Sequence, residues 1–155
     1  DPYISADSLK DYSNAELDSL NEVLKWGEII SLHASLTPET HHMIDESKLK
    51  LIKDDALLVN TARGAIIDEQ ALIKELKNDR FSAVLDVFER EPLSEDSELR
   101  NLDNVILIPH MGGVNEKENL TYGIVEEIER FINNEPLQYE VPYKQFNLMT
   151  RKVNK

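Results

Sequence analysis

The stretch Leu58–Asp68, L-V-N-T-A-R-G-A-I-I-D, decides how this chain folds. It begins inside an apolar run over residues 56–60, which is typical of a strand covered on both faces of an α/β protein. The run stops abruptly in a polar turn that contains Arg63, and Asp68 can cap a following helix. Open parallel sheets bind ligands at the carboxyl ends of their strands, and a planar guanidinium holds a carboxylate by two parallel hydrogen bonds. The stretch therefore predicts a strand, a ligand-binding turn and a helix in succession.

Two further strand ends carry residues of the acid–base type. Glu91 stands in D-V-F-E-R-E-P, after an apolar run over residues 82–86, and His110 stands in V-I-L-I-P-H-M-G-G, after the run 105–108. Each residue alone has a simpler explanation: Arg63 pairs with a local acid, Glu91 is solvated, and His110 caps a loop. Because the carboxyl ends of parallel strands meet at one edge of a sheet, the three together predict an acid–base site.

The remaining pattern alternates strands with helices. Ser19 with Glu22 forms a capping box, and Asp45 and Asp68 are further caps. The expected strands cover residues 29–33, 56–60, 82–86 and 105–108, and the expected helices cover residues 20–26, 46–51, 69–78 and 116–133. This order predicts an α/β fold with right-handed crossovers: a doubly wound, Rossmann-type parallel sheet in three αβα layers. The last helix has an apolar stripe at helical spacing, which predicts core packing: Ile124, Val125, Ile128, Phe131 and Ile132.

Composition excludes several classes of function. The chain has 155 residues and a formal net charge of −13, which argues against nucleic acid and anionic membranes as partners. No apolar run approaches the roughly 20 residues of a membrane helix. The absence of cysteine excludes a disulfide framework and favours a cytoplasmic location. His41 and His42 are adjacent, lack metal-ligand spacing and are expected to be surface residues, so no metal site is predicted.

The predicted site suits one reaction in particular. A histidine exchanges a proton near neutral pH, and a carboxylate beside it favours the imidazolium and fixes the tautomer. With His110 as the acid–base, Glu91 as its partner and Arg63 on a substrate carboxylate, the site suits reversible reduction of a 2-oxo acid. The alternatives are a binding or regulatory protein that keeps the fold without turnover, and an inactive truncated fragment.

These motifs resemble the D-isomer-specific 2-hydroxyacid dehydrogenases. The resemblance runs from D-P-Y at Asp1 to about Pro136, through S-L-H-A-S-L-T-P-E-T and the three motifs quoted above. It implies that Arg63 binds substrate, that Glu91 is the family's glutamate and that His110 is its catalytic histidine. A formate dehydrogenase fits less well, because that relative carries glutamine where Glu91 stands.

The resemblance also implies NAD as the cofactor. Asp1 takes the position of the acid that binds the adenine ribose and repels the extra phosphate of NADP, and Asp86 that of the aspartate on the nicotinamide carboxamide. His33, Thr37 and Pro38 would line the adenine side, Thr61 and Ala62 would present backbone near the nicotinamide, and Gly112 is a further expected contact.

The sequence departs from the family pattern at two points, and the first of them bears on the extent of the chain. The G-x-G-x-x-G phosphate loop is absent, and Ser35 stands where many members have proline. We therefore expect residues 1–115 to be a partial NAD-binding domain without its first βα unit. Residues 116–155 are expected to be a long helix and a tail returning to a substrate domain that is mostly absent. Such a half sheet exposes an edge and an apolar face, so we expect a homodimer or a pairing with the missing half.

Overall fold

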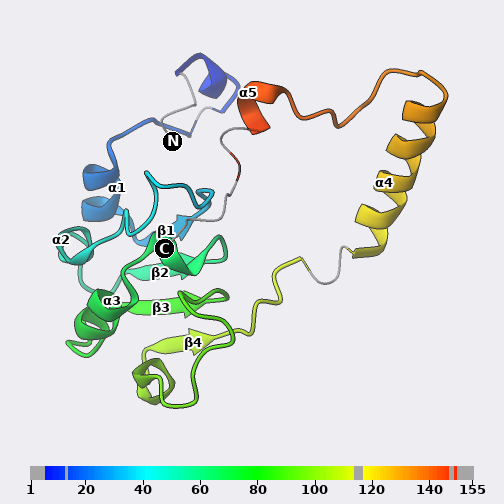
Figure 1. Cartoon of the computed structure of the whole chain (residues 1–155). Coiled ribbons are helices and arrows are strands. Elements are labelled where there is room, and N and C mark those ends of the chain that lie inside the picture. The colour runs from blue at the N-terminus through cyan, green and yellow to red at the C-terminus, as the bar shows by residue number, and fades with distance from the viewer. Residues whose placement is uncertain (1–5, 13, 114–116, 147–148, 150–155) are drawn as a thin grey trace.

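A four-stranded parallel sheet forms the centre of the computed structural model, which describes residues 6–12, 14–113, 117–146 and 149. The strands lie in the order β1-β2-β3-β4, and Leu58 is in register with Ile30 on one side and Ala83 on the other. Figure 1 shows all four arrows pointing the same way, so their carboxyl ends share one edge. The predicted α/β class is confirmed. The bounds are β1 Ile29–Leu32, β2 Leu57–Asn60, β3 Ser82–Leu85 and β4 Val105–Leu107.

The predicted caps begin the helices of the sheet region. Ser19 Oγ accepts from the Glu22 amide at 3.3 Å, and Asp68 Oδ1 accepts from the Ala71 amide at 3.0 Å. Two helices end earlier than predicted because their last turns tighten to bonds of three-residue spacing, such as Asn78 N–H to Glu75 O. The α-helices are α1 Leu20–Trp26, α2 Glu46–Leu49 and α3 Glu69–Leu76, and short 3₁₀ turns are η1 Ala6–Leu9, η2 Gly64–Ile66 and η3 Glu98–Asn101.

The core lies on one face of the sheet. Alternate residues of β1, β2 and β3 are buried, and their apolar members form one cluster with the inner sides of α1, α2 and α3, including Leu24, Leu49 and Leu72. The opposite face is more open, since Ile29 is 70% exposed and Ile106 is 61% exposed. Apolar side chains on this face are therefore left open, while the expectation of a partial domain stays a prediction. The described layers are the sheet and the layer of α1–α3, and the third layer stays a prediction.

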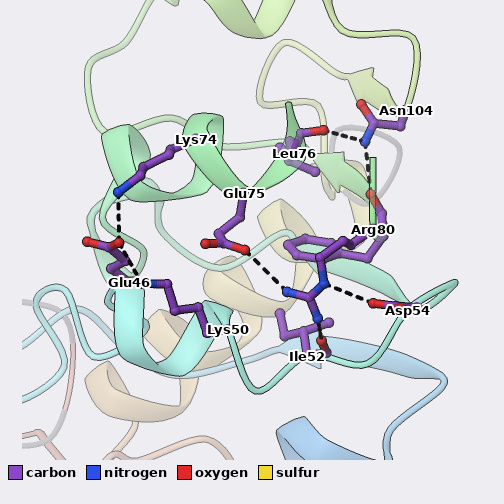
Figure 2. A network of polar contacts seen from close by, with 10 residues as sticks. Glu46, Lys50, Ile52, Asp54, Lys74, Glu75, Leu76, Arg80 and Asn104 are labelled. Atoms are coloured by element: carbon purple, nitrogen blue, oxygen red, sulfur yellow. Dashed lines mark hydrogen bonds and ion pairs between the residues drawn. The ribbon is translucent and has the colours of Figure 1, made fainter. Parts of the chain in front are cut away.

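A polar network closes the amino end of the sheet (Figure 2). Arg80 precedes β3; its Nε donates to Asp54 at 2.8 Å, its Nη1 donates to Glu75 at 3.2 Å, and its Nη2 donates to the Ile52 carbonyl. Glu75 is only 4% exposed, so this guanidinium neutralises a buried carboxylate. Asn104 bonds two carbonyls nearby and helps to place the start of β4.

The predicted burial of the last helix is wrong. Helix α4 (Lys117–Ile132) stands away from the sheet in Figure 1, and its apolar stripe is open, with Phe131 72% and Ile132 70% exposed. The 3.6-residue period identified the apolar side correctly, but periodicity does not say what covers that side. The tail beyond it holds the short α5 (Tyr143–Phe146), in which Tyr143 and Phe146 are exposed. No helix in the described part of the chain is long and apolar enough to cross a membrane.

Candidate active site

His110 and Glu91 meet at the carboxyl edge of the sheet. His110 Nδ1 lies 2.7 Å from Glu91 Oε2. The other carboxylate oxygen of Glu91 accepts from the Phe88 amide at 3.1 Å, so both oxygens are oriented. The imidazole is 48% exposed and is therefore open to a reactant. This arrangement fixes the tautomer: Nδ1–H donates to the carboxylate, and Nε2 is left to exchange a proton.

Asp86 holds the turn that carries His110. The backbone of His110 has φ of 50°, a left-handed conformation that is uncommon outside glycine, and its N–H donates to the Asp86 carbonyl at 2.9 Å. The Asp86 carboxylate is 2% exposed and accepts from the Met111 amide at 2.7 Å and the Gly112 amide at 2.9 Å. A Cβ on Gly112 would lie 2.7 Å from that carboxylate. The aspartate therefore stabilises a strained turn and places the histidine.

The Arg63 turn is built by the side chain of Asn60. The Asn60 amide is buried, donates to the Arg63 carbonyl at 3.0 Å and accepts from the Ala62 amide at 3.1 Å. Arg63 itself is exposed, and its Nη1 donates to the Ala62 carbonyl at 2.5 Å. Among the described residues its guanidinium meets no carboxylate within ion-pair distance. The simpler explanation, a local ion pair, therefore finds no support in this part of the chain.

Gly64 joins the Arg63 turn to the loop that carries Glu91. A Cβ at this position would lie 1.9 Å from the Phe88 carbonyl carbon, so only glycine allows the two backbones to approach. The structure thus brings the predicted arginine turn and the His110–Glu91 pair to one edge. Sequence reasoning gave no role to Asn60 or Gly64. Two sequence features could have identified them: Asn60 is the polar residue that ends an apolar run, and Gly64 directly follows the arginine.

The residues predicted for the adenine side follow β1. His33 Nε2 lies 2.8 Å from Ser31 Oγ. The Thr37 turn is closed by Thr40, whose Oγ1 accepts from the Thr37 amide at 2.8 Å and donates to the Ser35 carbonyl at 2.6 Å. Pro38 is exposed on that turn, as Thr61 is on the turn after β2. These positions lie at the same sheet edge, while Asp1 lies outside the described residues.

A cavity of about 600 Å³ borders the His110–Glu91 pair. Glu91 and His110 form its polar side. Its other walls are mainly apolar: Phe88, Pro92, Leu93, Leu107, Ile108 and Pro109, with Arg100. The site therefore has the concave, mostly apolar setting with few polar groups that small-molecule sites share.

Comparison with known sequences agrees with this geometry. The family described as D-isomer specific 2-hydroxyacid dehydrogenase, NAD binding domain, matches residues 1–112. The chain belongs to this family. The match contains Arg63, Asp86, Glu91 and His110, and it covers the whole sheet.

Two relatives and one solved structure show the range of similarity. The chain is 40% identical over 138 residues to a D-3-phosphoglycerate dehydrogenase of Methanocaldococcus jannaschii, covering 87% of this chain and 26% of that protein. It is 52% identical over 99 residues to a glyoxylate reductase of Thermococcus litoralis, covering 63% of this chain and 30% of that protein.

The solved structure is a D-isomer specific 2-hydroxyacid dehydrogenase from Xanthobacter autotrophicus Py2, in complex with NADPH and MES. It superposes with a TM-score of 0.72 at 35% identity, over 81% of this chain and 52% of that one. The chain thus spans about a quarter to a half of the length of these three proteins.

Proposed function

We propose that the protein containing this chain is an NAD-dependent D-2-hydroxyacid dehydrogenase that reversibly reduces a small 2-oxo acid. The observation that carries the proposal is the 2.7 Å contact between His110 Nδ1 and Glu91 Oε2. It lies at the same sheet edge as an arginine whose guanidinium meets no carboxylate among the described residues. Family membership supports the same reaction class.

His110 is the proposed acid–base. Its Nε2 gives a proton to the carbonyl oxygen during reduction and takes it back during oxidation. Glu91 stabilises the charged ring through Nδ1–H, and the Phe88 amide keeps the carboxylate aligned. Arg63 binds the substrate carboxylate through its planar fork and so fixes the neighbouring carbonyl.

NAD, when bound, supplies or accepts the hydride. The turn after His110 can accommodate a cofactor, because Gly112 is exposed there and has no side chain to obstruct one. Thr61, Ala62 and Asp86 are proposed for the nicotinamide side, and His33, Thr37 and Pro38 for the adenine side. Asp1 is the reason for choosing NAD over NADP, since a carboxylate repels the extra phosphate.

The proposal is tested by following NADH oxidation with the complete protein. Glyoxylate and hydroxypyruvate are the first substrates to try, because relatives are named glyoxylate reductase and glyoxylate/hydroxypyruvate reductase. We expect turnover with at least one 2-oxo acid, a D-configured product where the product is chiral, and slower turnover with NADPH. Binding of NADH without turnover of any 2-oxo acid would favour the non-catalytic alternative. Light scattering of the same sample tests the predicted homodimer.

A further inference from the structure

Outside the proposed active site, three potential metal ligands converge from two loops. These are His41, His42 and Glu89, whose ligand atoms all lie within 4.8 Å of one another. The sequence places Glu89 forty-seven residues beyond His42, so the spacing of the two histidines alone gave no sign of a site. The fold supplies the third ligand.

The geometry of one ligand pair already suits a metal ion. His42 Nε2 lies 3.0 Å from Glu89 Oε1. Two ligands held about 2.1 Å from zinc are roughly 3.0–3.4 Å apart, depending on their angle, so an ion can replace the shared proton. The His41 ring stacks on the His42 ring with centroids 4.0 Å apart, and its exposed side chain is free to turn toward the same point.

The backbone around these ligands is well fixed. His42 has φ of 51°, and its N–H donates to the Ala65 carbonyl at 2.8 Å. The Glu89 amide donates to Glu69 Oε2 at 3.0 Å, which ties the second loop to the start of α3. Both loops are therefore held before any ion arrives, which lowers the ordering cost of binding.

We propose that His41, His42 and Glu89 form a surface site for a late first-row divalent cation, with Zn²⁺ as the natural occupant. Two imidazoles and one carboxylate suit Zn²⁺ over Mg²⁺ or Ca²⁺, which prefer oxygen ligands. Water completes the coordination, and the net charge of −13 favours cation binding generally. The ion links the turn after β1 to the loop that carries Glu91. The site is separate from the His110–Glu91 pair and does not depend on the proposed reaction.

Calorimetric titration of the complete, chelator-treated protein with ZnCl₂ alone tests the proposal. We expect binding at this site at free zinc below ~100 µM and a higher Tm with zinc but not with MgCl₂. Glu89→Gln and His42→Gln should each weaken zinc binding at least ~10-fold. His33→Gln and His110→Gln are matched controls that remove a histidine elsewhere and should keep the wild-type affinity. Equal affinity in Glu89→Gln and wild type, or an affinity lost only in His110→Gln, overturns the proposal.

A second measurement needs no variant. Zinc should protect His41 and His42 from modification by diethyl pyrocarbonate, mapped by mass spectrometry, while His33 in the same sample stays reactive. If His33, His41 and His42 react equally with and without zinc, then His42 and Glu89 form only a surface ion pair with His41 beside it. That result also overturns the proposal.

Discussion

Two arginines at opposite ends of one sheet have opposite surroundings. Arg80, at the amino end, donates to Asp54, to Glu75 and to the Ile52 carbonyl. Arg63, at the carboxyl end, is exposed and donates only to its neighbour's carbonyl among the contacts of the described residues. The same side chain thus stabilises the fold where its donors are satisfied, and is available to a ligand where they are not. We expect changes at the amino end to lower stability and changes at the carboxyl end to lower activity.

The largest expected effect is at the carboxyl end. His110→Ala in the complete protein should lower kcat by ~10²–10⁴-fold, the usual contribution of a general acid–base group. The free energy of unfolding should hardly change, because the side chain is half-exposed. Stopped-flow or steady-state rates of NADH oxidation measure the loss, and fluorescence titration should give a nearly unchanged NADH affinity. A variant rate within about threefold of wild type would remove His110 from the mechanism.

The two arginines can be compared directly by the same substitution. Arg63→Met should lower kcat/KM by ~10²–10³-fold, because a bidentate charged contact is lost, and should change stability by less than about 0.5 kcal/mol. Arg80→Met should lower the free energy of unfolding by about 2–3 kcal/mol, since Glu75 is left buried without its partner. That figure is reduced from the range for fully buried pairs because the Arg80 side chain is 29% exposed. Urea unfolding measures the free energy of unfolding of each variant, and initial rates measure its kcat/KM. If the two variants lose stability equally, or lose activity equally, the contrast between the two arginines is wrong.

Arg63→Lys refines the first half of that test. Lysine keeps the charge but cannot reproduce the planar fork, so KM for the 2-oxo acid should rise and kcat should fall. NADH affinity should stay close to that of wild type. A lysine variant that loses NADH affinity and keeps its substrate KM would place Arg63 on the cofactor instead.

Sequence reasoning predicted the sheet well because its signals are local. Apolar runs ended by polar turns identified all four strands, and a cap before an apolar period identified α1 and α3. The same logic brought Arg63, Glu91 and His110 to one edge, since parallel strands share their carboxyl ends.

Contacts between distant segments could not be predicted in this way. Glu75 looks like a surface residue in the sequence, yet it is 4% exposed and accepts a hydrogen bond from Arg80. The apolar stripe of α4 gives the opposite case, since its period predicts burial and Phe131 is 72% exposed. The Asn60 amide and the Gly64 contact also depend on segments that meet only in the fold.

Gly64 lies between the two halves of the proposed site and should affect both stability and activity. Gly64→Ala forces a Cβ to within 1.9 Å of the Phe88 carbonyl carbon, so the Arg63 turn and the Glu91 loop must separate. We expect a loss of about 1–3 kcal/mol in the free energy of unfolding, as for other overpacked sites, and a fall in kcat/KM. Gly123→Ala is the matched control: nothing lies within 4 Å of its Cβ position in α4. It should leave activity intact and stabilise the helix by about 0.5–1 kcal/mol. Equal behaviour of the two alanine variants would show that the close approach at Gly64 is unimportant.

The smallest expected effect concerns Glu46, whose exposed side chain pairs with Lys50 and Lys74 (Figure 2). Hydrogen bonds from Lys50 and Lys74 lower the pKa of Glu46 from 4.5 to about 2, and Glu46 in turn raises the pKa of Lys74. A carboxyl whose pKa is lower in the folded state stabilises the fold above its unfolded pKa of 4.5, and this contribution disappears as the pH falls toward 2. The stability difference between wild type and Glu46→Gln should therefore be constant near about pH 6–7 and shrink between pH 4.5 and 2. Urea unfolding across this range measures it, and added salt should reduce it, because the Glu46 side chain is 43% exposed. A difference that persists unchanged at pH 2 would mean that Glu46 acts through packing rather than through its charge.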